Sequence, residues 1–232
     1  MSAVQELFRE TPAKSTTEIA PPAYVRGSIQ PDERSAAKLV HGEQIRGLVE
    51  QLFFCSESKP VRHVAFAPAG ESTGSATLCY EVASALAEEG RYDVAIVDAA
   101  PKLTPLQIQL NVPTLSRPEN SWPIAPHLWL VPRESWLPDR SDLRVSDEHL
   151  SRLRDLTGEF DFSIVWCPPV SWLTASIVQA CDGLVLVLRA NRTRRLVAAQ
   201  IKHQLCKARV PILGTVLMDR RFPVPEALYR NL

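Results

Sequence analysis

The sequence has 232 residues, which is enough for one large α/β domain or two small ones, and one domain is the simpler interpretation. Lys and Arg together number 26, as do Asp and Glu, so the formal net charge is zero and no general affinity for nucleic acid or anionic lipid is expected. The five cysteines are dispersed, with neither a CxxC pair nor a zinc-site spacing, which is typical of buried thiols in a cytoplasmic protein.

Residues 1–34 are expected to form a flexible leader, because positions 11–34 are rich in Pro, Ser, Thr and charge, and a short helix, "AVQELFRE", is expected near its start. No signal peptide is recognisable. The longest apolar runs, such as "LVLVL", fall far short of the roughly 20 residues that cross a bilayer. We therefore expect a cytoplasmic protein without direct membrane insertion, which a partner could recruit to the inner face of the plasma membrane.

Residues 35–232 are predicted to form a single α/β domain. An amphipathic helix is expected from about Ser35 to Phe54, and further helices over residues 76–89, ended by Gly90, and 196–208. Short, Val-, Ile- and Leu-rich runs recur between helical segments and are typical of strands buried on both faces of a parallel sheet: "VRHVAF", "DVAIVD", "LWLV", "FSIVWC", "LVLVLR" and "ILGTVLM". The pattern predicts a doubly wound, mainly parallel sheet with helices on both faces, with residues 113–146 as an irregular excursion over one edge.

A glycine-bearing loop, "APAGESTGSAT" at residues 67–77, joins the first expected strand to a helix. Ligands of open parallel sheets bind beyond the carboxyl ends of the strands, where loops meet helix amino ends. Residues 98–105 and 167–171 belong to the same edge of the sheet. The three loops together predict a phosphate or nucleotide site.

Four blocks of the sequence resemble the bacterial tyrosine kinases of capsule and exopolysaccharide synthesis, a branch of the ParA/MinD group of P-loop ATPases. The blocks are "VAFAPAGESTGSATLCYEVASALAEEG", "YDVAIVDAAPKLTPL", "EFDFSIVWCPPVSWLTASIVQACDGLVLVLRANRTRRL" and "VPILGTVLMDRR". The resemblance extends from about Ala36 to the C-terminus. It implies a P-loop fold and a nucleotide site built from a PGEGKS-type loop, aspartates in "IDADLR" and "IIDTPP", and an asparagine in "VVLN".

This sequence departs from the family pattern in all four blocks. In the loop, Gly74 matches the last glycine, Ser75 replaces the lysine, Ala76 replaces the metal-binding Ser or Thr, and Thr77 matches the threonine that follows. In the other blocks Asp98 matches an aspartate of the family pattern. Ala100 and Trp166 each replace an aspartate, and Met218 replaces the asparagine.

These replacements predict a degenerate site. The lysine of a P-loop neutralises charge on the transferring phosphoryl group, and Mg²⁺ needs hard oxygen ligands, which Ala and Trp do not supply. We therefore expect no catalytic residue, no metal and no required cofactor, while ATP or ADP binding without efficient turnover stays open. The residues that would hold such a nucleotide are Gly70, Glu71, Gly74, Ser75, Thr77 and Asp98.

Several alternatives apply to this loop and its surroundings. "GESTGSAT" can be read as a strand-to-helix turn in which Ser and Thr cap the helix. Lys102 or Arg62 could substitute for the missing lysine, although neither lies on the loop. The basic run "RANRTRR" is interpreted as the loop and first helical turn after a strand, with a phosphate or nucleic-acid patch as the alternative. No aromatic residues interleave with it, so nucleic acid is not expected as a partner.

A partial interface motif lies on the first helix. The kinases carry ExxRxxR there for contacts between subunits, and "EQIRGLV" retains Glu43 and Arg46. The alternative is a solvated face with an i,i+3 ion pair. The kinases also end in a tyrosine cluster that they phosphorylate, whereas this tail has Tyr229 alone.

The resemblance implies a catalytically degenerate partner or regulator of exopolysaccharide or capsule polymerisation and export. Its expected partner is a membrane polysaccharide copolymerase, bound through its cytoplasmic ends, and self-association stays open. Two other functions remain: an active ATP-dependent tyrosine autokinase that uses displaced residues, and a ParA/MinD-like positioning ATPase.

Overall fold

The computed structural model describes residues 35–55, 60–70, 74–100, 103–111, 120–137 and 145–219. Several predictions of the sequence analysis lie outside these ranges: the leader 1–34, Glu71, Lys102 and the tail with Tyr229. The chain forms a seven-stranded sheet with the order β3-β4-β2-β5-β1-β6-β7. Its strands are β1 (His63–Pro68), β2 (Val94–Asp98), β3 (Trp122–Ala125), β4 (Leu128–Val131), β5 (Phe162–Trp166), β6 (Gly183–Arg189) and β7 (Ile212–Met218).

All neighbouring strands pair in parallel except β3 and β4, which are antiparallel. β1, β2 and β5 in the centre are buried almost throughout, because a parallel sheet in a doubly wound fold is covered on both faces. The six predicted strands are confirmed to within two residues at each end. The prediction of an irregular excursion over residues 113–146 was wrong in part, since β3 adds an edge strand to the sheet there.

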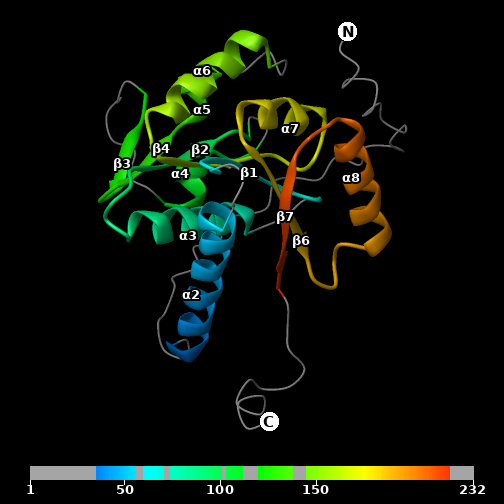
Figure 1. Cartoon of the computed structure of the whole chain (residues 1–232), viewed down its shortest axis with the longest axis horizontal. Coiled ribbons are helices and arrows are strands. Elements are labelled where there is room, and N and C mark those ends of the chain that lie inside the picture. The colour runs from blue at the N-terminus through cyan, green and yellow to red at the C-terminus, as the bar shows by residue number, and fades with distance from the viewer. Residues whose placement is uncertain are drawn as a thin grey trace, which may run out of the picture.

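Helices cover both faces of the sheet (Figure 1). The helical elements are α2 (Ser35–Val49), the π-helical turn η1 (Glu50–Phe54), α3 (Ser75–Ala87), α4 (Leu106–Gln109), α5 (Arg133–Trp136), α6 (Asp147–Gly158), α7 (Trp172–Ile177), the 3₁₀ turn η2 (Val178–Ala180) and α8 (Arg195–Lys207). The doubly wound α/β architecture is therefore confirmed. Gly90, with φ of 64°, ends the turn after α3 as predicted.

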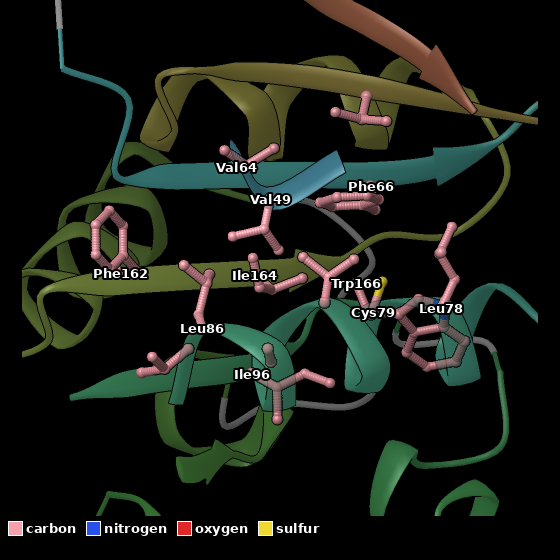
Figure 2. Packing of buried hydrophobic residues seen from close by; sticks show 14 of the residues in the cluster. Val49, Val64, Phe66, Leu78, Cys79, Leu86, Ile96, Phe162, Ile164 and Trp166 are labelled. Carbon is pink, nitrogen blue, oxygen red and sulfur yellow. The ribbon is translucent and has the colours of Figure 1, made fainter. Parts of the chain in front are cut away.

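Two hydrophobic clusters divide the core between the faces. The first joins α2, η1 and α3 to alternate residues of the central strands, and the second joins the other residues of these strands to α5, α6, α7 and α8. Figure 2 shows part of the first cluster, where Phe66 of β1 and Trp166 of β5 lie beside Leu78 and Cys79 of α3. Within the described part of the chain, none of the helices has the length and apolar character to span a membrane.

Candidate functional site

The carboxyl ends of the parallel strands meet at one edge of the sheet, where the predicted site should lie. Ala69 continues from β1 and donates its backbone N–H to Val187 of β6 over 2.9 Å. Gly74 then precedes α3 in a left-handed conformation, with φ of 108°, and accepts the first helical hydrogen bond from Leu78. The strand, loop and helix expected of a phosphate cradle are thus present, with α3 beginning at Ser75.

Ser75, which is assigned from the sequence to the position of the family lysine, is bonded to Trp166, which is assigned to the position of a family aspartate. The indole Nε1 of Trp166 donates to Ser75 Oγ over 3.0 Å, although the two residues lie 91 positions apart in the sequence. Both are only 2% exposed. Two replacements that the sequence presents separately therefore form one buried contact.

The start of α3 bears on the alternative that Ser and Thr of "GESTGSAT" cap the helix. The residue before α3 is Gly74, and no side-chain cap bonds the first turn there. Ser75 Oγ accepts from Trp166 instead. Ser75 therefore does not cap this helix, because its hydroxyl faces the core, while Ser72 and Thr73 of the same stretch lie outside the described residues.

The other replaced positions are apolar and lie in the same part of the core. Ala76 and Ala100 are 3% and 0% exposed and belong to one hydrophobic cluster with Trp166. Met218, at the end of β7, packs against this cluster, and its Cε lies 3.2 Å from the place a Cβ on Gly74 would occupy. Where the family pattern has hard oxygen ligands and a base-contacting amide, this chain places packing groups.

Asp98, the one retained carboxylate, is fully buried and accepts hydrogen bonds on both oxygens. Its Oδ1 accepts from the Ala100 N–H over 3.0 Å, and its Oδ2 accepts from the Leu106 N–H over 2.9 Å and from Arg133 Nη2 over 3.1 Å. Burial raises the pKa of Asp98, while these donors lower it. The carboxylate thus holds the turn between β2 and α4 and anchors α5.

Arg133 and Trp136 were missed by sequence reasoning. Arg133 Nη2 also donates to the Leu103 carbonyl over 3.1 Å, and Trp136 Nε1 donates to the Asp98 carbonyl over 3.0 Å. Both side chains are buried. They lie more than 30 positions after Asp98 in a segment without a periodic pattern, so the sequence carried no signal of the contact.

The remaining predicted site residues are not brought into this cradle. Thr77 is exposed on α3, and Gly70 is exposed with open space around the place of a Cβ. On α2, Glu43 and Arg46 are both exposed. Arg46 lines a hollow of about 480 Å³ between the end of α2 and the end of α3, together with Glu50, Phe54, Glu88 and Tyr92. The nucleotide-site assignment and the interface assignment both stay predictions.

Among the described residues, no group of three or more His, Cys, Asp or Glu side chains is arranged to hold a metal ion. The cysteines are free, and burial raises the pKa of Cys181 to about 12. Burial also raises the pKa of Cys79 and Cys167. These three thiols are therefore poor nucleophiles.

Comparison with solved structures defines the class of fold. The kinase domain of VpsO matches with a TM-score of 0.64 and 15% identity, over 82% of this chain and 98% of that chain. The kinase domain of Escherichia coli tyrosine kinase ETK matches with a TM-score of 0.63 and 16% identity, over 79% of each chain. A ParA family ATPase from Chlorobium tepidum matches with a TM-score of 0.52 and 16% identity, over 73% and 78%. The fold is that of the ParA-like P-loop ATPases.

Sequence comparison narrows the class. "Tyrosine-protein kinase CpsD" of Streptococcus agalactiae is 30% identical over 94 residues, which are 40% of this chain and 41% of that protein. The same protein of strain NEM316 is 29% identical over 94 residues, or 40% of each chain. The match thus spans about two fifths of the length of these curated relatives, and no family model matches the chain. The chain is thus similar in fold to bacterial tyrosine kinase domains and ParA-like ATPases, and similar in sequence, over part of its length, to CpsD-type tyrosine kinases.

Proposed function

We propose that this protein is a kinase-like binding protein of exopolysaccharide or capsule assembly, whose phosphate cradle no longer supports phosphoryl transfer. The observation that carries the proposal is the buried hydrogen bond from Trp166 Nε1 to Ser75 Oγ. It links the position of the phosphate-binding lysine to the position of a catalytic aspartate. Neither side chain carries a charge.

The chemistry of phosphoryl transfer supports this proposal. Catalysis in P-loop enzymes comes from positioning and from stabilising the charge on the phosphoryl oxygens, through a lysine and Mg²⁺. Ser75 cannot neutralise that charge, and Ala76 and Ala100 offer Mg²⁺ no oxygen. The carboxylate of Asp98 already accepts from two backbone N–H groups and from Arg133. A metal ion would have to break these bonds before Asp98 could coordinate it.

The function would then be binding. The chain would dock on the cytoplasmic ends of a membrane polysaccharide copolymerase, and its bound state would bias polymer length or export. Its relation to CpsD-type kinases supports the pathway, and its fold supports only the architecture. The exposed Glu43 and Arg46 on α2 offer a charged face for the partner or for a second copy of the chain.

The catalytic part of the proposal is tested with purified full chain, ATP and Mg²⁺. We expect neither ATP hydrolysis nor phosphotyrosine above the level of a heat-denatured sample, while a kinase with an intact loop lysine, assayed in parallel, shows both. Turnover that is abolished by Asp98→Asn would contradict the proposal and favour an active autokinase. ATP-driven dimerisation in the same samples would favour a ParA/MinD-like positioning ATPase.

The binding part is tested by co-purification with the cytoplasmic ends of the copolymerase and by the polymer length in a strain lacking this protein. We expect co-purification and an altered length distribution. A strain carrying Asp98→Asn should then produce polymer of the wild-type length, provided that the variant accumulates normally, because the role would not need catalysis. Loss of the protein without any change in polymer would contradict the proposed role.

A further inference from the structure

A second hollow lies at the carboxyl edge of the sheet. Its volume is about 430 Å³, and its walls are Ala69 and Gly70 after β1, the end of β6, and the segment from Arg192 to Val197 that enters α8. Arg189, Arg192 and Arg194 all line it. The hollow is therefore lined by an exposed glycine and by three arginine side chains.

Hydrogen bonds within the loop between β6 and α8 stabilise its conformation. Thr193 Oγ1 accepts from the Arg189 N–H over 3.0 Å, and the Thr193 N–H donates to the Arg189 carbonyl over 2.9 Å. Asn191 adopts φ of 61°, which closes the tight turn. The Ala190 N–H donates to the Met218 carbonyl over 2.8 Å, and Arg189 forms an ion pair with Asp219. A preorganised loop loses little conformational entropy when a ligand binds.

The hollow carries positive charge that the described residues do not neutralise. Arg192 and Arg194 are exposed, and no carboxylate in the described ranges pairs with either. The first turn of α8, which begins at Arg195, has no acidic residue. Its free N–H groups add partial positive charge at the same place, because Arg194 is the N-cap residue and bonds none of them with its side chain.

We propose that this hollow binds the phosphate or diphosphate group of a small anionic ligand without a metal ion. Arginine suits that role because its planar guanidinium can donate two parallel hydrogen bonds to phosphate oxygens. Gly70 lets the phosphate approach the loop, since a Cβ there would meet nothing within 4 Å. Val197, 40% exposed at the rim, offers an apolar surface to the rest of the ligand.

The inference goes beyond the proposed function and does not depend on it. Two sources of the phosphate share this chemistry: a free diphosphate and the diphosphate of a nucleotide. Calorimetry with inorganic pyrophosphate and with ADP, both in EDTA, separates them. Equal affinity indicates a free diphosphate, and tighter binding of ADP indicates a nucleotide whose base or sugar contacts the rim.

The decisive variants change the charge of the hollow. The double variant Arg192→Gln/Arg194→Gln removes two charge-assisted interactions and should weaken pyrophosphate binding by roughly 10- to 100-fold. Gly70→Glu places a carboxylate in the hollow and should weaken binding similarly. Arg152→Gln on α6, an exposed site outside the hollow, is the matched control and should change affinity by no more than about twofold. Thermal unfolding of each variant establishes that it is folded.

Three results would overturn the assignment. They are the absence of pyrophosphate binding to the wild-type chain, binding that needs Mg²⁺, and an affinity that the double variant and Gly70→Glu leave unchanged. Binding of a polyglutamate peptide without binding of pyrophosphate would also overturn it, in favour of an acidic protein segment. Kinase activity of the purified chain would contradict the proposed function, but it would not affect the conclusion drawn from pyrophosphate binding to the hollow.

Discussion

Trp166 of β5 donates its indole N–H to the hydroxyl of Ser75, the first residue of α3, over 3.0 Å, in an interior where each residue is 2% exposed. Trp166 is also the register partner of Phe66 on β1 and of Asp98 on β2. The contact therefore ties the phosphate-loop helix to the centre of the sheet. Trp166, at a position that could have bound a ligand, packs in the interior and stabilises the fold instead.

Trp166→Phe should destabilise the chain by about 1 to 3 kcal/mol, because Ser75 Oγ loses its donor in a buried place and the smaller ring leaves a cavity. Ser75→Ala should also destabilise, since the indole N–H then lacks an acceptor. The double variant should lose less stability than the sum of the two single variants. Urea unfolding of the four proteins measures this coupling.

Trp129→Phe is the control for this cycle, because Trp129 is half-buried and packs on Phe160 with ring centroids 5.7 Å apart. It should show no coupling to Ser75→Ala. Strict additivity of Trp166→Phe and Ser75→Ala would mean that the hydrogen bond contributes nothing to stability.

The buried ion pair between Arg133 and Asp98 should be sensitive to loss of the arginine. Arg133→Met leaves the Asp98 carboxylate without its cation, and we expect a loss of about 3 to 5 kcal/mol in the free energy of unfolding. Arg133→Met/Asp98→Asn removes the uncompensated charge and should recover part of that loss. Equal stability of the single and double variants, measured by urea unfolding, would contradict an energetic role for the pair.

Gly74 adopts φ of 108°, and a Cβ there would lie 3.2 Å from Met218 Cε. Gly74→Ala should therefore cost about 1 to 3 kcal/mol, mostly from backbone strain that residues with a side chain rarely tolerate. The Met218→Ala substitution removes the contact with the new Cβ but not the backbone strain. Adding Gly74→Ala to Met218→Ala should therefore destabilise the chain nearly as much as adding it to the wild type. Thermal unfolding measures the difference. Gly70→Ala, with open space around its Cβ, is the matched control and should cost little.

The stability of the chain should fall as the pH is lowered through the titration of His63. Burial lowers the pKa of His63 below its ordinary value of 6.5, while Asp182 raises it. The unfolded chain therefore binds the proton more readily, so this stability is present above the ordinary pKa of 6.5 and is lost as the pH falls below it. His63 Nδ1 lies 3.0 Å from Ser163 Oγ, and protonation must also rearrange that contact if the nitrogen is the acceptor.

His63→Gln should reduce this dependence, and His203→Gln, at an exposed position on α8, should retain that of the wild type. Urea unfolding at a series of pH values provides the comparison. Identical slopes for His63→Gln and wild type would show that another group accounts for the dependence.

The sheet was the part of the fold that the sequence predicted best. Runs such as "FSIVWC" and "DVAIVD" are apolar on both faces, and that composition is stable only in a strand covered on both sides. β3 was missed because Trp122 and Pro123 lie in a proline-rich stretch with no strand-like run of residues. It forms as an edge strand, where proline is tolerated because one side of the strand needs no partner.

The sequence indicated at which edge of the sheet the candidate site would lie, but not which side chains contact one another there. Replacement of the lysine and aspartates was visible in the sequence, as was the edge of the sheet at which Gly74, Ser75 and Asp98 would lie. The partners of Asp98 were not visible, since Arg133 is 35 positions away in the chain. The arginine-lined hollow beside Gly70 was likewise visible only as a basic run.

The sequence by itself determined that the chain forms a doubly wound sheet and that the loop after its first strand contains no lysine, because hydrophobic patterns and residue types are local properties. The tertiary structure alone decided that Ser75 meets Trp166, that Asp98 meets Arg133, and that Gly70 faces Arg192 and Arg194. These contacts depend on strand order, which places β2 beside β4 and brings β5, β1 and β6 together from distant parts of the chain. Hydrogen bonds and ion pairs act over a few ångströms in space, and separation along the sequence does not specify them.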